Sequence, residues 1–154
     1  MIPSTTERVR VNTAVEFNER IRRRTEQSIA RCAEAGPDAI DCRLEELDRE
    51  WDIERTLEAN AATAVLVGVG LGAVVDRKFF IVPALVGGFL LQHAVQGWCP
   101  PLPLFRRLGF RTQSEIEEER FALKALRGDF REQPPSYGRT QPSATRQAIA
   151  AVRR

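Results

Sequence analysis

Two side chains that often take part in catalysis or metal binding stand six positions apart near the middle of the chain. His93 is the only histidine, and Cys99 is one of three cysteines. Imidazole and thiol together are typical of a metal site or a redox centre, yet one of each is too few for a closed zinc site. Three prolines follow at 100, 101 and 103. The stretch from Leu91 to Phe105 is therefore either a chemical site or the end of a helix.

The position of Cys99 favours the second interpretation. Because Pro100 follows it, Cys99 is pushed out of helical backbone space. A thiol just past a helix C-terminus faces the negative end of the helix dipole, which disfavours the thiolate. Cys99 is therefore a candidate thiol without a predicted activating group.

The polar side chains before it also mark a helix end. Gln92, His93 and Gln96 stand shortly before Trp98, a residue typical of the membrane interface. An ionisable group within a membrane segment is a functional candidate by default. The structural alternative is a neutral imidazole that bonds a facing Thr63 or Asn60, or carbonyls of its own helix.

The elements that must position these residues are two uncharged segments. Residues 59–75 hold seventeen residues without a charge, residues 76–78 read DRK, and residues 79–98 hold twenty more without a charge. At 1.5 Å per residue the first spans about 25 Å and the second about 30 Å, close to the thickness of a bilayer core. The pattern predicts a two-helix transmembrane hairpin. The soluble alternative is a buried helical hairpin in a globular core.

Small residues recur every four positions in both segments. They are Ala64, Gly68 and Gly72 in the first, and Ala84 and Gly88 in the second. Small residues at this spacing let helix backbones approach closely in lipid. They predict either closure of the hairpin or the seam of a homodimer, and we expect a dimer.

Basic residues indicate the orientation. Six flank the hairpin base (Arg43, Arg49, Arg55, Arg106, Arg107 and Arg111), and the connecting turn has Arg77 and Lys78. Since cytoplasmic loops carry the excess of Lys and Arg, both termini are predicted to be cytoplasmic.

Polar segments lie on both sides of the hairpin. Residues 1–58 carry 10 basic and 14 acidic residues and predict an acidic helical arm, with a helix from about 13 and a second from 38 that can run unbroken to 67. Residues 100–130 predict an interfacial segment with its arginines at headgroup level, then a helix capped by Thr112 with Glu115 or by Ser114 with Glu117. Residues 131–154 predict a disordered basic tail.

Sequence motifs for catalysis and cofactor binding are absent. There is no Walker loop, GxSxG or HExxH, and the Gly-rich run at 68–72 lies inside an apolar helix. The run EIEEE at 115–119 resembles a metal carboxylate cluster, but a solvated helix face is the better interpretation. No metal or cofactor is predicted, and the near-balance of charge gives no case for nucleic-acid binding.

The segment from residue 52 to 108 resembles the small inner-membrane domain of YgaP-like rhodaneses. The shared pattern is a Glu-Arg pair, a Gly-rich helix, a short turn and a second helix that ends in Gly-x-Cys-Pro. These positions are Glu54, Arg55, Gly97, Cys99 and Pro100. The resemblance implies a bacterial two-helix inner-membrane domain that can dimerise, in a longer subgroup without the rhodanese domain. Rhodanese catalysis does not carry over, because no rhodanese-sized domain is present.

The sequence thus predicts an all-α membrane protein that is not an enzyme. It would assemble through its hairpin in the lipid bilayer and present cytoplasmic helices to partners. The alternative is a sulfur-handling or thiol-relay protein that uses Cys99 and is linked to a rhodanese-type sulfurtransferase. A third option is a soluble helical scaffold.

Overall fold

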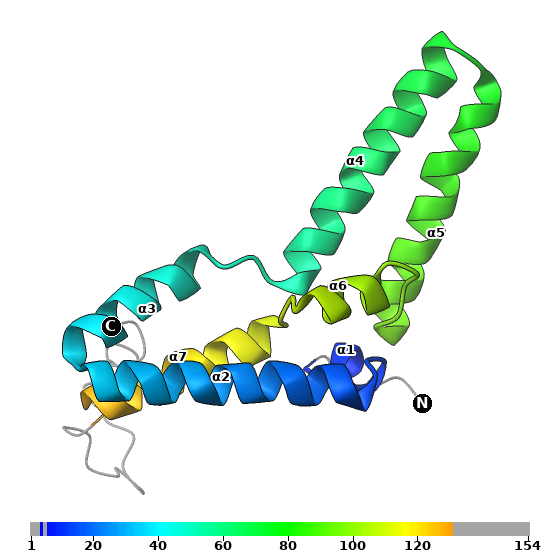
Figure 1. The fold of residues 1–154 in the computed structure, drawn as a ribbon. Coiled ribbons are helices and arrows are strands. Elements are labelled where there is room, and N and C mark those ends of the chain that lie inside the picture. The colour runs from blue at the N-terminus through cyan, green and yellow to red at the C-terminus, as the bar shows by residue number, and fades with distance from the viewer. Residues whose placement is uncertain (1–3, 5, 131–154) are drawn as a thin grey trace, which may run out of the picture.

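The computed structural model describes residue 4 and residues 6–130, and this part of the chain contains helices and no strands. The all-α prediction is therefore confirmed for the described residues. A group of polar helices lies at one end, and two long helices project from it (Figure 1). The predicted tail at 131–154 falls outside the described residues.

The base, as we call it, consists of α2 (Val15–Ala35), α3 (Pro37–Arg49) and α7 (Gln113–Arg127), which pack against one another. Apolar residues at helical spacing explain this packing, because they form one stripe on α3 and one on α7. Their side chains form a core of Ile40, Leu44, Leu47, Ile116 and Leu123. Gly36 joins α2 to α3 with a φ of 98°, a conformation that favours glycine.

The predicted continuous helix from 38 to 67 is interrupted. Glu50 leaves helical backbone space, and the Asp52 side chain accepts a hydrogen bond from the Arg55 amide at 2.7 Å. Asp52 is thus the N-cap of a new helix, although no Gly or Pro marks the break in the sequence. Trp51 lies in the break and packs against the Arg55 guanidinium, 4.2 Å from the ring centroid.

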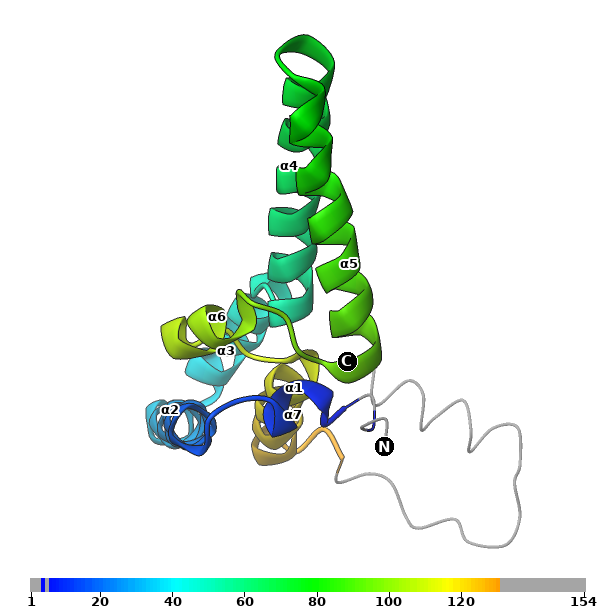
Figure 2. The same cartoon turned by 90° about the vertical axis from the view of Figure 1, so that its right-hand side faces the viewer.

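The hairpin, as we call it, comprises α4 (Ile53–Val74), the 3₁₀ turn η1 (Arg77–Phe80) and α5 (Ile81–Gln96). α4 and α5 lie side by side in both ribbon views (Figures 1 and 2). Close approach depends on two glycines of α4. A Cβ on Gly68 would lie 2.7 Å from Pro83 Cδ, and one on Gly72 would lie 3.0 Å from the Phe80 ring.

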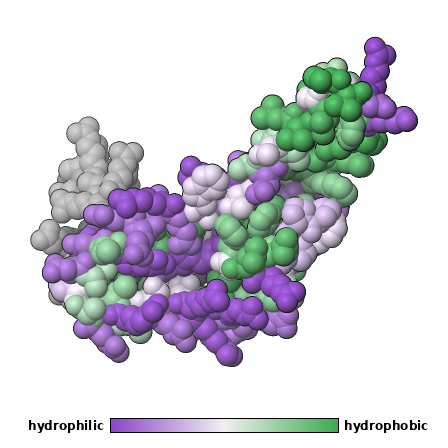
Figure 3. All heavy atoms as spheres, turned by 45° about the horizontal axis from the view of Figure 1, so that its top comes forward, coloured by the Kyte–Doolittle hydropathy of each residue, from purple (hydrophilic) through white to green (hydrophobic). Residues whose placement is uncertain are grey.

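Two helical stretches are apolar and long enough to cross a membrane, by length and composition. The first stretch, from Pro37 to Val74, comprises α3, the break and α4, and the second runs from Arg77 to Gln96. Within their most apolar windows only 17% and 6% of residues are buried in the molecule. Apolar residues cover the hairpin, and polar residues cover the base on the face drawn in Figure 3.

Two short helices surround the end of the hairpin that meets the base, which we call the foot. They are α1 (Arg8–Val11) and α6 (Leu102–Leu108). A second small core forms there from Val9, Ile53, Leu57, Cys99 and Leu102, with Phe105 and Phe110 against it. Of the apolar residues predicted to lie along the lipid interface, Leu102 is instead fully buried in this core, whereas Leu104 and Leu108 are exposed.

Candidate functional site

The C-terminal end of α5 is held by the side chains of Arg8 in α1 and of Asn12, the residue that follows α1. Arg8 donates to the Ala94 carbonyl at 3.1 Å, and Asn12 donates to the Gln96 carbonyl at 2.8 Å. These bonds satisfy carbonyls that a helix end leaves without partners. Gly97 ends the helix with a φ of 76°, which is the left-handed conformation.

His93 is buried at this helix end, with 5% of its surface exposed. Its Nε2 lies 2.8 Å from Glu54 Oε2, and the other Glu54 oxygen accepts a hydrogen bond from Arg8 at 3.0 Å. The prediction that Thr63 or Asn60 would be the partner of His93 is wrong. Both of those side chains instead bond carbonyls of α4.

The site therefore joins three segments that are remote in sequence: Arg8 of α1, Glu54 of α4 and His93 of α5. The sequence carried a signal for it, since Glu54 belongs to the Glu-Arg pair before the first apolar helix. Spacing alone gave no indication that Glu54 and His93, 39 positions apart, would meet.

Cys99 lies at the same place. It is a free thiol with 5% of its surface exposed. A cavity of about 190 Å³ between α4 and α5 has both residues in its lining. The other two cysteines, Cys32 and Cys42, are also free and belong to the base. His93 and Cys99 are thus brought together, and Glu54 completes the group.

The remaining predicted polar residues do not join this site. Gln96 is exposed and contributes only its backbone carbonyl, to Asn12. Gln92 is half-buried. Arg55 packs on Trp51 and Pro100 is exposed, so neither belongs to the group around His93.

The predicted helix-packing residues occupy two different surfaces. Gly68 and Gly72 are buried between α4 and the Phe80–Pro83 segment, and Ala64 is half-buried beside the cavity. Ala84 and Gly88 are exposed, and a Cβ on Gly88 would meet nothing within 4 Å. The two halves of the predicted stripe therefore do not face each other within one molecule.

A second polar group, which sequence analysis missed, connects the foot to the base. Arg106 has only 1% of its surface exposed and donates two hydrogen bonds to Glu115, at 2.7 and 2.8 Å. It also donates to the Phe110 carbonyl and to Asn18 of α2. The prediction that Arg106 would lie at headgroup level is therefore wrong, because a buried ion pair holds it in the protein interior.

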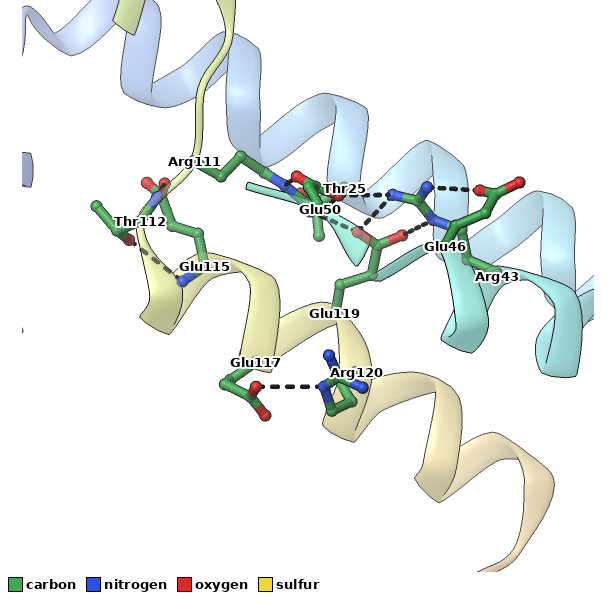
Figure 4. Close-up of polar contacts among 10 residues, drawn as sticks. All are labelled: Thr25, Arg43, Glu46, Glu50, Arg111, Thr112, Glu115, Glu117, Glu119 and Arg120. Carbon is green, nitrogen blue, oxygen red and sulfur yellow. Dashed lines mark hydrogen bonds and ion pairs between the residues drawn. The ribbon is translucent and has the colours of Figure 1, made fainter. Parts of the chain in front are cut away.

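A third group lies inside the base. Arg111 bonds both oxygens of Glu50, at 2.8 and 2.6 Å, and also bonds Glu119. Arg43 bonds both oxygens of Glu119, at 2.9 and 3.1 Å (Figure 4). Glu119, which is fully buried, therefore lies between two arginines from different segments.

These contacts correct the interpretation of EIEEE as a solvated helix face. Glu115 and Glu119 are four apart on the buried side of α7, whereas Glu118 is exposed. Glu115 also completes the predicted capping box with Thr112 (Figure 4). The run could have suggested this role, since buried carboxylates need cationic partners and Arg106 and Arg111 stand nearby in sequence.

The arginines keep both carboxylates charged. Burial raises the pKa of Glu115, but hydrogen bonds from Arg106 and the Thr112 amide outweigh it and hold the pKa below the ordinary 4.5. For Glu119, burial again raises the pKa. Hydrogen bonds from Arg43, Ser28 and Arg111 lower it by more, so that it also lies below 4.5. Both of these carboxylates are therefore ionised at neutral pH.

No set of three His, Cys, Asp or Glu side chains among the described residues is placed to hold a metal ion. Comparisons with family models, with curated proteins and with solved structures return no match for this chain.

Proposed function

We propose that the chain is an integral membrane protein without enzymatic activity, whose hairpin crosses the cytoplasmic membrane twice. The observation that carries this proposal is the exposure of the hairpin's apolar surface. Leu66, Val74 and Ile81 expose 72%, 86% and 60% of their surface. A core helix of a soluble protein would bury such residues, whereas a bilayer covers them without a protein partner.

The polar base supports the same assignment. Its own core and the ion pair between Arg111 and Glu119 hold it together through contacts within the protein. We infer that the base stays at one membrane face and presents helical surfaces to cytoplasmic partners. The excess of basic residues at the foot over the turn favours the cytoplasmic side.

Extraction of membranes with alkaline carbonate tests the first step. The full chain is expected in the membrane pellet, and its appearance in the supernatant would sink the proposal. For orientation, a single cysteine is placed in the turn by Lys78→Cys in a Cys32→Ser/Cys42→Ser/Cys99→Ser background. A membrane-impermeant maleimide should label it in intact spheroplasts. Cys42 as the only cysteine is the matched control and should react only after lysis.

We also propose that two copies associate through the exposed small residues Ala84 and Gly88. Their lack of a partner within one molecule supports this seam, because small residues allow close helix contact in lipid. A Gly88→Leu substitution should abolish crosslinked dimers in membranes. Leu85→Ile, an exposed change one helical turn away, should retain them. Equal crosslinking of both variants would contradict the seam.

Thiol chemistry at Cys99 is a second candidate function, because Glu54, His93 and Cys99 share one buried site. In this case the resemblance to YgaP-like domains suggests a sulfur-handling or thiol-relay protein of the bacterial inner membrane. A persulfide on Cys99 after incubation with a rhodanese-type sulfurtransferase would support it. Full function of a Cys99→Ser strain would count against it.

A further inference from the structure

The cavity beside Cys99 has one apolar end and one polar end. Leu57 and Ala64 of α4 line it together with Val86, Phe89 and Leu90 of α5, so nearly all of its wall is hydrocarbon. His93 and Cys99 lie at the foot, where the hairpin meets the base. The apolar end continues into the exposed surface of the hairpin, where Leu66 and Phe89 project outwards. The shape suits a ligand with a reactive head and a long apolar chain.

The hydrogen bonds at the polar end fix the state of the imidazole. Glu54 accepts hydrogen bonds from both Arg8 and His93, as an ionised carboxylate does. Because a carboxylate only accepts, His93 Nε2 carries the proton in that bond. In the neutral form of the ring, the lone pair is then on Nδ1. That atom is buried and has no hydrogen-bond partner among the described residues.

Nδ1 is the ring nitrogen available to accept the proton of the Cys99 thiol. Nε2 is bonded to Glu54, and Cys99 lines the same cavity as His93. A thiol, a base and a carboxylate that orients the base form the arrangement by which proteins activate a nucleophile.

We propose that Cys99 is an S-acylation site that accepts a long-chain acyl group from an acyl thioester. The acyl chain would occupy the cavity and continue along the hairpin into lipid. This inference rests on the proposed membrane location and specifies the thiol chemistry as acyl transfer.

The reaction balances without an oxidant or reductant. The Cys99 sulfur attacks the carbonyl carbon of the donor while His93 Nδ1 takes the thiol proton. The new sulfur–carbon bond forms, the donor's own carbon–sulfur bond breaks, and His93 returns the proton to the leaving thiolate. Glu54 stabilises the imidazolium in between. The products are an acyl thioester on Cys99 and a free thiol.

Incubation of the purified full chain with palmitoyl-CoA in detergent micelles tests the proposal. The Cys32→Ser/Cys42→Ser variant keeps Cys99 as its only cysteine, and a Cys32→Ser/Cys99→Ser variant keeps the exposed Cys42 as a matched control. Intact mass should show one hydroxylamine-sensitive acyl group on Cys99, gained at least tenfold faster than on Cys42. Equal rates, or acylation of Cys42 alone, would overturn the proposal.

Two further variants separate chemistry from folding. His93→Gln should slow acyl transfer about 100-fold, the lower range of general-base catalysis, while circular dichroism stays unchanged. Ala64→Phe should slow palmitoyl transfer but leave acetyl transfer from acetyl-CoA intact, because it fills only the apolar end. Leu66→Phe, an exposed change on the same helix, is its control. A loss of both transfers, or of neither, contradicts the role of the cavity.

The outcome is separable from that of the membrane proposal. Carbonate extraction reports on location whether or not Cys99 is acylated, and the acylation assay in micelles needs no bilayer. A persulfide on Cys99 together with no acyl group would overturn acylation and favour sulfur handling.

Discussion

Gly97 lies against the backbone of Arg8 so closely that a Cβ on Gly97 would stand 2.5 Å from the Arg8 carbonyl oxygen. The contact joins the end of α5 to α1, and the Arg8 and Asn12 side chains bond the same helix end. The glycine of the Gly-x-Cys-Pro ending thus has a structural requirement of its own, apart from any chemistry at Cys99.

Replacement of Gly97 by Ala should therefore lower stability for two reasons. The left-handed φ of 76° costs a non-glycine residue about 1–2 kcal/mol, and displacement of a backbone neighbour adds about 1–3 kcal/mol. Chemical unfolding in detergent micelles, followed by circular dichroism, measures the sum. Gly109→Ala has the same left-handed conformation but meets only the movable end of the Arg24 side chain, so it should show mainly the smaller, conformational part. Equal losses in both variants would argue against the contact.

The close approach of α4 and α5 gives a second prediction. Gly68→Val should destabilise the hairpin by about 1–3 kcal/mol, because a Cβ there would lie 2.7 Å from Pro83 Cδ. Gly70→Val is the control, since Gly70 is on the same helix with nothing within 4 Å. Thermal midpoints in micelles should fall for the first variant alone. A similar shift for both would mean that helix propensity, not packing, limits stability.

The ion pair between Arg106 and Glu115 gives a third prediction. Arg106→Gln should cost about 3–5 kcal/mol, because it leaves a buried carboxylate without its cation. The Arg106→Met/Glu115→Met double variant should recover most of the loss, since an apolar pair avoids burial of charge. Arg49→Gln, which alters an exposed pair, should leave the unfolding midpoint unchanged. An intact midpoint for Arg106→Gln would show that the pair has no structural role.

Sequence patterns predicted the helices well, because apolar spacing and uncharged length are local properties. The stripe of Ile40, Leu44 and Leu47 does form the buried face of α3. The break after Arg49 was missed because Asp52, an N-cap, has no helix-breaking neighbour. The first long helix, predicted from about residue 13, has Ala14 at its N-cap position, and the Thr13 side chain bonds the Val9 carbonyl instead.

The sites were harder to predict, because they depend on tertiary contacts. Cys99 and His93 were recognised by residue type, but their partner Glu54 lies one helix away. Arg106 and Arg111 looked like headgroup anchors because exposed and buried arginines have the same local sequence signature. Only the packing of α7 beneath them distinguishes the two cases.

The buried carboxylates give a fourth prediction, on the pH dependence of stability. Burial opposes the charge of Glu115 and Glu119, but bonds from Arg106, Arg43 and Arg111 lower their folded-state pKa values below 4.5. A carboxyl whose pKa is lower in the folded state stabilises the fold above its unfolded pKa and loses that contribution as pH falls. The free energy of unfolding should therefore be flat from pH 7 to about 5 and should decline below pH 4.5, the ordinary carboxyl value.

Urea unfolding in micelles between pH 7 and pH 3 measures this decline. In the Arg106→Met/Glu115→Met variant one of the two carboxyls no longer titrates, so the decline should be shallower from a similar starting stability. The difference in slope isolates Glu115 from all other carboxyls, because both proteins share the rest of the acidic residues. A constant free energy down to pH 3, or identical slopes in both proteins, would mean that Arg106 does not hold Glu115 in its charged form.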